Sequence, residues 1–231
     1  MADANVARMR LIIGNKNYSS WSLRPWLLLR ALEIPFEEEA LSFNDPSFGA
    51  RVRRFSPAGK VPVLVDGDFA VWDSLAIVEY LAEKFPDHGI WPEERLARAR
   101  ARSISAEMHA GFPNLRARLP MNCEFRQSNI ALELSVQREI ARIVELWTDC
   151  RSQFGASGPF LFGAFTAADA YYAPVVRRFL DHDVALPNVA RRYANSVDEL
   201  PAMRDWISAA LAEHDFVPSD EPYREPPGER H

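Results

Sequence analysis

The sequence predicts an α/β domain at the N-terminus followed by an all-helical bundle. Strand-like and helix-like runs alternate through residues 10–85, and beyond a proline-containing stretch at 86–92 the apolar residues recur only at helical spacing. The chain has 231 residues, 48% of them apolar, which is enough for two modest domains with their own cores. We expect a first domain at residues 1–85, a linker at 86–92, a helical domain at 93–216 and a proline-rich tail at 217–231.

The first half of the N-terminal domain reads as strand, helix, strand, helix. Residues 10–14 form a short apolar run ending in turn residues, which predicts a buried strand. From Ser22 apolar residues recur at helical spacing to about Glu33, which predicts a helix with a hydroxyl residue as its cap. Residues 36–43 alternate weakly like a second strand, and residues 46–55 indicate a short helix.

The second half of this domain contains the clearest hairpin. Residues 61–65 and 69–72 are strand-like runs joined by Asp-Gly-Asp, and Asp-Gly is a strong tight-turn signal. A long amphipathic helix follows from about Ser74. The resulting order, β-α-β-α-β-β-α, is the thioredoxin-like order and predicts a mixed four-stranded sheet with helices.

The C-terminal part contains only helical patterns. Thr166 and Asp169 have the spacing of a capping box at the start of one helix. The tail is rich in proline and charge, and we expect it to be loosely ordered. Helices are predicted at residues 94–119, 130–154, 167–180, 189–195 and 200–212.

Composition and charge exclude several functions. The formal net charge of −5 comes from interspersed charges, so nucleic-acid or membrane binding is not expected. The N-terminus has no signal-peptide pattern and no segment is long and apolar enough to span a membrane, which predicts a cytoplasmic protein. Cys123 and Cys150 lack partners at metal-ligand spacing, so we expect reduced thiols and no metal.

Hydroxyl side chains cluster between the first strand and the first helix. Tyr18, Ser19, Ser20 and Ser22 lie where a βα junction directs hydroxyls and free helix amides at a ligand. An anion there, such as a thiolate, would also be stabilised by the helix dipole. Taken alone, the same hydroxyls are also consistent with simple helix capping.

A second candidate site brackets the hairpin. Lys60, Val61 and Pro62 precede it, and a cis proline would leave the Val61 backbone free to pair with a peptide-like ligand. Asp73 offers an acceptor for an ammonium, while Ser74 and the amides of its helix offer donors for a carboxylate. Together these groups suit an α-amino-acid head group, although an ordinary Asp-Ser helix cap has the same sequence.

Three segments, in this order, resemble the cytosolic glutathione transferases over roughly residues 10–215. Residues 19–24, SSWSLR, resemble the SSCSxR motif of the serine-type zeta class, with Trp21 in place of the cysteine. Residues 57–64, PAGKVPVL, resemble the family's NPxGKVPxL segment, and residues 73–81, DSLAIVEYL, resemble its (E/Q)SxAIxEYL segment. The chain is thus identified as similar to a serine-type, zeta-like bacterial member.

The resemblance implies a role for each matching residue, with glutathione as co-substrate. Ser19 would donate to the glutathione thiolate, with Ser20 and Ser22 as nearby candidates and the Tyr18 phenol as a lesser one. The substitution at Trp21 puts zeta-type maleylacetoacetate isomerisation in question without affecting the glutathione site.

The remaining matched positions imply contacts along the tripeptide. Val61 would pair with the cysteinyl backbone, Lys60 would reach the glycyl carboxylate, and Asp73 with Ser74 would hold the γ-glutamyl group. The predicted electrophile pocket lies between the domains, on a helix that carries Met108, His109, Phe112 and Arg116, although helical spacing of apolar residues is equally typical of core packing.

The function expected from this resemblance is a detoxifying transfer of alkyl or aryl groups to glutathione, with a small hydrophobic electrophile as second substrate. A glutathione-dependent isomerase and a non-catalytic glutathione-binding or stress protein of the same fold are the alternatives. A homodimer is expected from the family.

Overall fold

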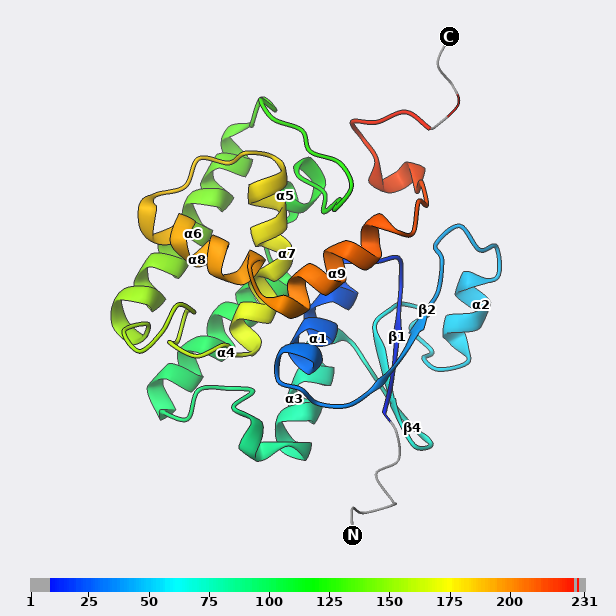
Figure 1. The fold of residues 1–231 in the computed structure, drawn as a ribbon, viewed down its shortest axis with the longest axis horizontal. Helices are drawn as coiled ribbons and strands as arrows, with labels where there is room; N and C mark the ends of the chain where they lie inside the picture. Colours follow the sequence, from blue (N-terminus) through cyan, green and yellow to red (C-terminus); the bar gives the residue numbers. More distant parts are fainter. Residues whose placement is uncertain (1–8, 227, 229–231) are drawn as a thin grey trace.

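The computed structural model describes residues 9–226 and 228, so the first eight residues and part of the predicted tail, 227 and 229–231, lie outside it. A sheet with its helices forms one side of the molecule and a helical bundle the other (Figure 1). The predicted fold class, a thioredoxin-like domain followed by an all-helical part, is confirmed. Within the described residues, no helix is long and apolar enough to cross a membrane.

The sheet contains four strands in the order β2-β1-β3-β4. β1 (Arg10–Ile13) pairs in parallel with β2 (Glu37–Ala40) and antiparallel with β3 (Val63–Asp66), which forms the predicted hairpin with β4 (Phe69–Trp72). β1 is central and buried, as its apolar run predicts.

Helix α1 (Ser20–Ala31) joins the two parts of the molecule. It begins two residues earlier than the sequence predicts and packs on α3 (Ser74–Lys84) as well as on the helical bundle. The predicted hydroxyl cap is wrong: Ser19 is the N-cap residue but makes no side-chain bond to a helix amide, because its hydroxyl is engaged by another side chain. The short helix α2 (Phe48–Arg53) lies on the outer side of the sheet (Figure 1).

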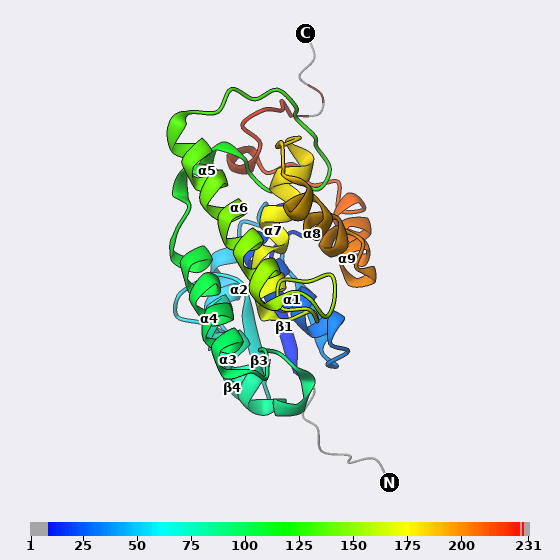
Figure 2. The same cartoon turned by 90° about the vertical axis from the view of Figure 1, so that its left-hand side faces the viewer.

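The bundle is built around α7 (Ala167–Asp181), which is buried along nearly its whole length and packs on α1, α4 (Arg95–Ala110) and α8 (Asn188–Asp198) (Figure 2). The predicted single helix over residues 94–119 is wrong. Phe112 has a φ of +63° and Pro113 cannot donate a backbone hydrogen bond, so the chain breaks there into α4 and α5. The helices are α4 (Arg95–Ala110), α5 (Pro113–Arg118), α6 (Leu134–Phe154), α7 (Ala167–Asp181), α8 (Asn188–Asp198) and α9 (Pro201–Leu211).

The predicted capping box opens α7. The buried Asp169 carboxylate accepts hydrogen bonds from the Thr166 amide at 2.9 Å and from the Leu161 amide at 3.1 Å. Asp169 thereby ties the start of the central helix to the preceding loop.

Replacing Asp169 with alanine is expected to destabilise the fold by about 2–4 kcal/mol, because two buried amides lose their acceptor. For a chain of this size, that corresponds to a fall in Tm of roughly 5–15 °C in a calorimetric scan. Asp149→Ala, an exposed carboxylate on α6, is the control and should change Tm little. An equal effect of the two substitutions would contradict the structural role of Asp169.

Residues 213–224, called here the C-terminal strap, return across the N-terminal domain. Val217 and Glu221 are buried, and Tyr223 donates a hydrogen bond of 2.7 Å to the Arg118 carbonyl. The expectation of a loosely ordered tail is therefore wrong for residues 217–224, because their polar side chains have specific partners.

Candidate active site

The loop between β1 and α1 is held by close packing and by one buried hydroxyl. A Cβ at Gly14 would lie 2.3 Å from the Phe43 ring, so any other residue there would displace that ring. The Gly14 amide donates to Ser22 Oγ at 3.2 Å, and Ser19 Oγ lies 2.7 Å from the same oxygen. Ser22 is fully buried and organises the loop, whereas Ser19 and Ser20 reach a cavity.

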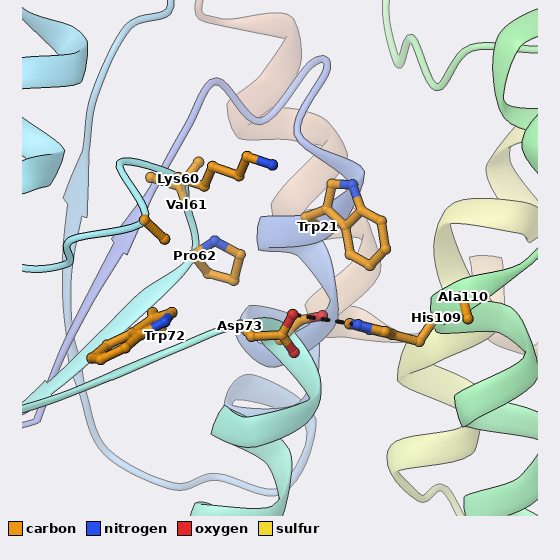
Figure 3. A pocket seen from close by; sticks show the side chains of 10 residues that line it. Trp21, Lys60, Val61, Pro62, Trp72, Asp73, His109 and Ala110 are labelled. Atoms are coloured by element: carbon orange, nitrogen blue, oxygen red, sulfur yellow. Dashed lines mark ion pairs between the residues drawn. The ribbon is translucent and has the colours of Figure 1, made fainter.

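The residues predicted to hold the γ-glutamyl end meet around a cavity of about 420 Å³, called here the hairpin cavity (Figure 3). The Val61–Pro62 peptide bond at its edge is cis, and Val61 lies outside the strand ladder. The cavity is lined by Trp21, Ala58, Lys60, Val61, Pro62, Trp72, Asp73, Ser74, His109 and Ala110.

A second cavity, of about 560 Å³, lies between α1, α5, α7 and the C-terminal strap and is called here the interdomain cavity. It shares Trp21, Lys60 and Val61 with the hairpin cavity, so the two adjoin. Its lining comprises Tyr18, Ser19, Ser20, Trp21, Phe43, Phe48, Gly59, Lys60, Val61, Arg116, Pro120, Met121, Arg178, Val217, Ser219 and Asp220.

Asp73 occupies an unusual backbone conformation at the start of α3. Its φ is +75°, which is uncommon for a residue other than glycine and is typically retained where a ligand site requires it. One carboxylate oxygen accepts from the Leu75 amide at 2.8 Å, and the other lies 3.3 Å from His109 Nε2 (Figure 3). The neighbouring Ser74 hydroxyl lies 3.1 Å from the Tyr171 hydroxyl.

The four residues predicted for the electrophile pocket separate in the structure. Met108, on the buried face of α4, and Phe112, at the break between α4 and α5, both pack in the hydrophobic core. His109 lines the hairpin cavity and Arg116 the interdomain cavity. Sequence reasoning missed Arg178, whose only signal was a charged side chain on a helix otherwise suited to burial.

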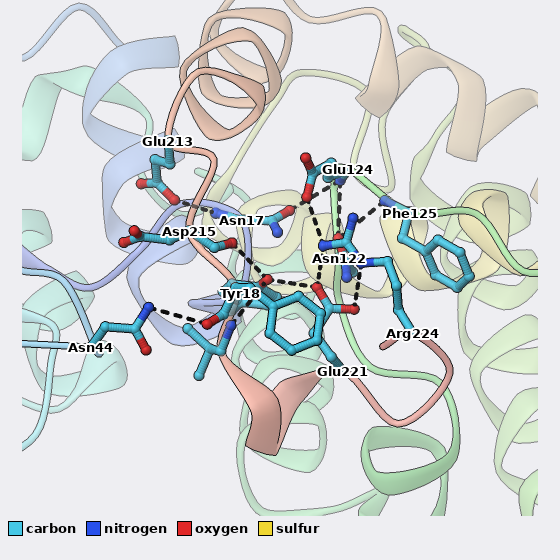
Figure 4. A network of polar contacts seen from close by, with 12 residues as sticks. Asn17, Tyr18, Asn44, Asn122, Glu124, Phe125, Glu213, Asp215, Glu221 and Arg224 are labelled. Atoms are coloured by element: carbon cyan, nitrogen blue, oxygen red, sulfur yellow. Dashed lines mark hydrogen bonds and ion pairs between the residues drawn. The ribbon is translucent and has the colours of Figure 1, made fainter. Parts of the chain in front are cut away.

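Tyr18 does not point its hydroxyl at the serines. Its oxygen lies 2.6 Å from a Glu221 carboxylate oxygen and 3.0 Å from the Asp215 carbonyl, both on the C-terminal strap (Figure 4). Burial and the hydrogen bond to Glu221 raise the pKa of Tyr18 to about 12. The geometry assigns Tyr18 to holding the strap over the interdomain cavity.

Tyr18→Phe is expected to loosen the strap, because the buried Glu221 loses a hydrogen-bond donor. The rate of protease cleavage near residue 220 should increase about three- to tenfold. Tyr223→Phe removes a hydroxyl elsewhere on the strap and is the control for a general loss of strap contacts. Unchanged cleavage in Tyr18→Phe would contradict the role of Tyr18 in holding the strap.

Residues 18–84 match the model of the glutathione S-transferase N-terminal domain, and residues 131–209 match that of the C-terminal domain. The chain belongs to the glutathione S-transferase family. The two models together cover residues 19–22, called here the serine loop, as well as the hairpin, α3 and most of the bundle.

The similar proteins differ in how much of this chain they match. Glutathione S-transferase Z1 of Arabidopsis thaliana is 25% identical over 90% of this chain and 95% of its own length. The dichloromethane dehalogenase of Methylorubrum extorquens is 44% identical over 62 residues, and the match spans 26% of this chain and only 22% of the dehalogenase. A Burkholderia glutathione transferase homolog, solved with bound glutathione, superposes with a TM-score of 0.67 at 20% identity, covering 89% of this chain and 99% of that chain.

Proposed function

We propose that this protein is a glutathione transferase that activates the glutathione thiol with a serine hydroxyl at the start of α1. The observation that carries the proposal is the adjoining pair of cavities. The residues predicted for the γ-glutamyl end line the hairpin cavity, whereas Ser19 and Ser20 line the interdomain cavity beyond Trp21. A tripeptide spanning both would place its sulfur near these hydroxyls.

Simple energetics support thiolate formation at this position. Lowering a thiol pKa from about 8.5 to about 6.5 requires roughly 2.7 kcal/mol of preferential thiolate stabilisation. A helix N-terminus contributes up to about 2 kcal/mol in partly buried geometry, and a hydrogen bond to a charged group about 1.5–3 kcal/mol. Ser19 and α1 are therefore sufficient, and the thiolate formed would attack a small electrophile in the interdomain cavity.

The other predicted residues contact the two ends and the backbone of glutathione. Asp73 accepts the γ-glutamyl ammonium, and Ser74 with the amides of α3 binds the neighbouring carboxylate. Val61 pairs with the cysteinyl backbone through its free main-chain groups, and the exposed Lys60 reaches the glycyl carboxylate.

The deciding experiment is a glutathione titration by calorimetry, combined with ultraviolet detection of thiolate in the complex between about pH 5 and pH 9. We expect binding, with the thiolate signal appearing well below the ordinary thiol pKa. Binding without this signal would favour a non-catalytic glutathione-binding protein. Absence of binding would contradict the proposal.

We also propose that the protein is a homodimer. Phe69 and Trp72 on the edge strand β4 are 64% and 43% exposed, and a second copy would shield these large apolar side chains. Sedimentation at micromolar concentration is expected to give twice the chain mass, and Phe69→Glu should shift the protein toward the monomer. A monomeric wild-type protein would contradict this.

A further inference from the structure

Three arginines from three different helices, Arg24, Arg116 and Arg178, lie near the start of α1, and two of them contact the Trp21 ring. The Arg24 guanidinium lies 4.1 Å from the centre of the Trp21 ring and that of Arg116 lies 4.8 Å from it. Arg178, on α7, donates to Ser20 Oγ at 3.4 Å. Arg116 and Arg178 line the interdomain cavity, whereas Arg24 is fully buried behind Trp21.

These guanidinium groups contact neutral acceptors instead of carboxylates. Arg178 donates to the carbonyls of Leu119 and Arg116, and Arg116 donates to those of Met108 and Gly111. Over residues 9–226 and 228, none of the three arginines has a carboxylate within ion-pair distance.

Of the three arginines, Arg24 has the fewest hydrogen-bond partners among the described residues. Its Nε donates to the Tyr171 carbonyl at 3.3 Å, but its two terminal nitrogens are buried and have no hydrogen-bond partner among the described residues. Contact with the Trp21 ring compensates a guanidinium charge only in part.

Arg177, the neighbour of Arg178 on α7, has carboxylate partners. It is almost fully buried, and its guanidinium is paired with the carboxylates of Asp181 and Asp198. Two adjacent arginines on the buried helix α7 therefore differ: Arg177 is paired with two carboxylates, whereas Arg178 is paired with none among the described residues. Asp220 also lines the interdomain cavity, but its carboxylate accepts from Ser219 and is not ion-paired with Arg178.

Grouping three unpaired cations is electrostatically unfavourable. Burial, together with repulsion from Arg116, lowers the pKa of both Arg24 and Arg178 to about 9. An anion in the interdomain cavity would relieve this repulsion. Arginine suits such a role, since its planar fork binds a carboxylate through two parallel hydrogen bonds. The apolar part of the lining, which includes Phe43, Phe48 and Met121, would cover the body of a small organic molecule.

We propose that the interdomain cavity selects an electrophile that carries a carboxylate, held by Arg116 and Arg178 while its reactive carbon faces the serine loop. The inference rests on the proposed transferase function and narrows its substrate class from hydrophobic to anionic. A carboxylate of glutathione is the alternative ligand for Arg116 and Arg178. Comparing a charged with an uncharged electrophile distinguishes the two ligands.

The test compares two electrophiles that differ only in charge, 4-(chloromethyl)benzoate and 4-(chloromethyl)benzamide. In both, the thiol loses its proton to solvent, and a C–S bond forms as the C–Cl bond breaks and chloride leaves with the bonding pair. The wild-type protein is expected to prefer the benzoate, and Arg116→Met to lower the ratio of the two kcat/KM values about tenfold or more. A general folding defect would affect both substrates and leave the ratio unchanged.

Arg118→Met is the matched control. Arg118 lies on the same helix, donates to the Ala131 carbonyl and is not part of the cavity lining, so this substitution should leave the ratio unchanged. Arg116→Lys, which retains the charge, should restore part of the preference. If Arg116→Met keeps the wild-type Tm, an unchanged ratio would overturn the proposal. An equal loss of kcat/KM with both electrophiles, accompanied by a rise in glutathione KM, would assign the arginines to glutathione.

Direct binding separates this proposal from the proposed function. The unreactive pair 4-methylbenzoate and 4-methylbenzamide is titrated into wild-type and Arg116→Met protein by calorimetry. Preferential binding of the benzoate that is lost in Arg116→Met supports the anionic cavity even if neither chloromethyl compound is turned over. Turnover of both electrophiles with equal affinity for the unreactive pair would retain the transferase and reject the anionic cavity.

Discussion

Ser19→Ala is expected to lower kcat for conjugation about 10- to 100-fold, because a hydrogen bond donated to a charged group contributes roughly 1.5–3 kcal/mol. In the structure Ser19 Oγ lies 2.7 Å from Ser22 Oγ, which accepts the Gly14 amide proton. With glutathione bound, Ser22 can donate to Ser19 while Ser19 donates to the sulfur, so the hydroxyls polarise one another toward the thiolate. Removing Ser19 should raise the pKa of the bound thiol by about 1–2 units, measured by ultraviolet titration.

The neighbouring serines provide the controls for Ser19. Glutathione affinity should change less than about threefold in Ser19→Ala, because the backbone contacts remain. Ser22→Ala leaves the Gly14 amide without its acceptor, and we expect it to lower Tm more than Ser19→Ala does and to raise the thiol pKa less. Ser20→Ala should retain most of the turnover. If Ser19→Ala kept a normal thiol pKa and normal turnover, the activating role would pass to Ser20 or Ser22.

The sequence was informative wherever structure depends on local chemistry. The apolar run of β1, the Asp-Gly turn of the hairpin and the Thr166–Asp169 capping box each specify their geometry within a few residues, and all three are present. The break between α4 and α5 was missed although Gly111 and Pro113 signal it, because the flanking segments share one helical apolar pattern.

The candidate site was predictable only where its residues fall in compact motifs. Ser19, Lys60 and Asp73 belong to such motifs, and the structure places all three on the linked cavities. Arg178 and the C-terminal strap were missed because they reach the site through long-range packing: Tyr18 and Glu221 are bonded across more than half of the chain. Hydrophobic periodicity locates a helix face but does not identify which neighbouring helix covers it.

Asp73→Asn is expected to raise the dissociation constant for glutathione about 10- to 100-fold, since an ammonium–carboxylate hydrogen bond contributes roughly 1.5–3 kcal/mol. Asparagine is the informative replacement because it tolerates the positive φ at this position and can still accept from the Leu75 amide. Alanine would remove the charge and the helix cap together and would also be strained. Calorimetry of glutathione binding measures the effect, and Tm should remain within about 2 °C of wild type.

The control for Asp73 is a glutathione analogue that lacks the γ-glutamyl amino group. If Asp73 binds the ammonium, the analogue should bind wild-type and Asp73→Asn protein equally, and the loss of affinity should appear only with glutathione itself. A loss of equal size with both ligands would show that Asp73 acts by supporting the start of α3 or its contact with His109. Unchanged glutathione affinity in Asp73→Asn would contradict the γ-glutamyl assignment, because the Asp73 carboxylate would then not stabilise the bound ammonium.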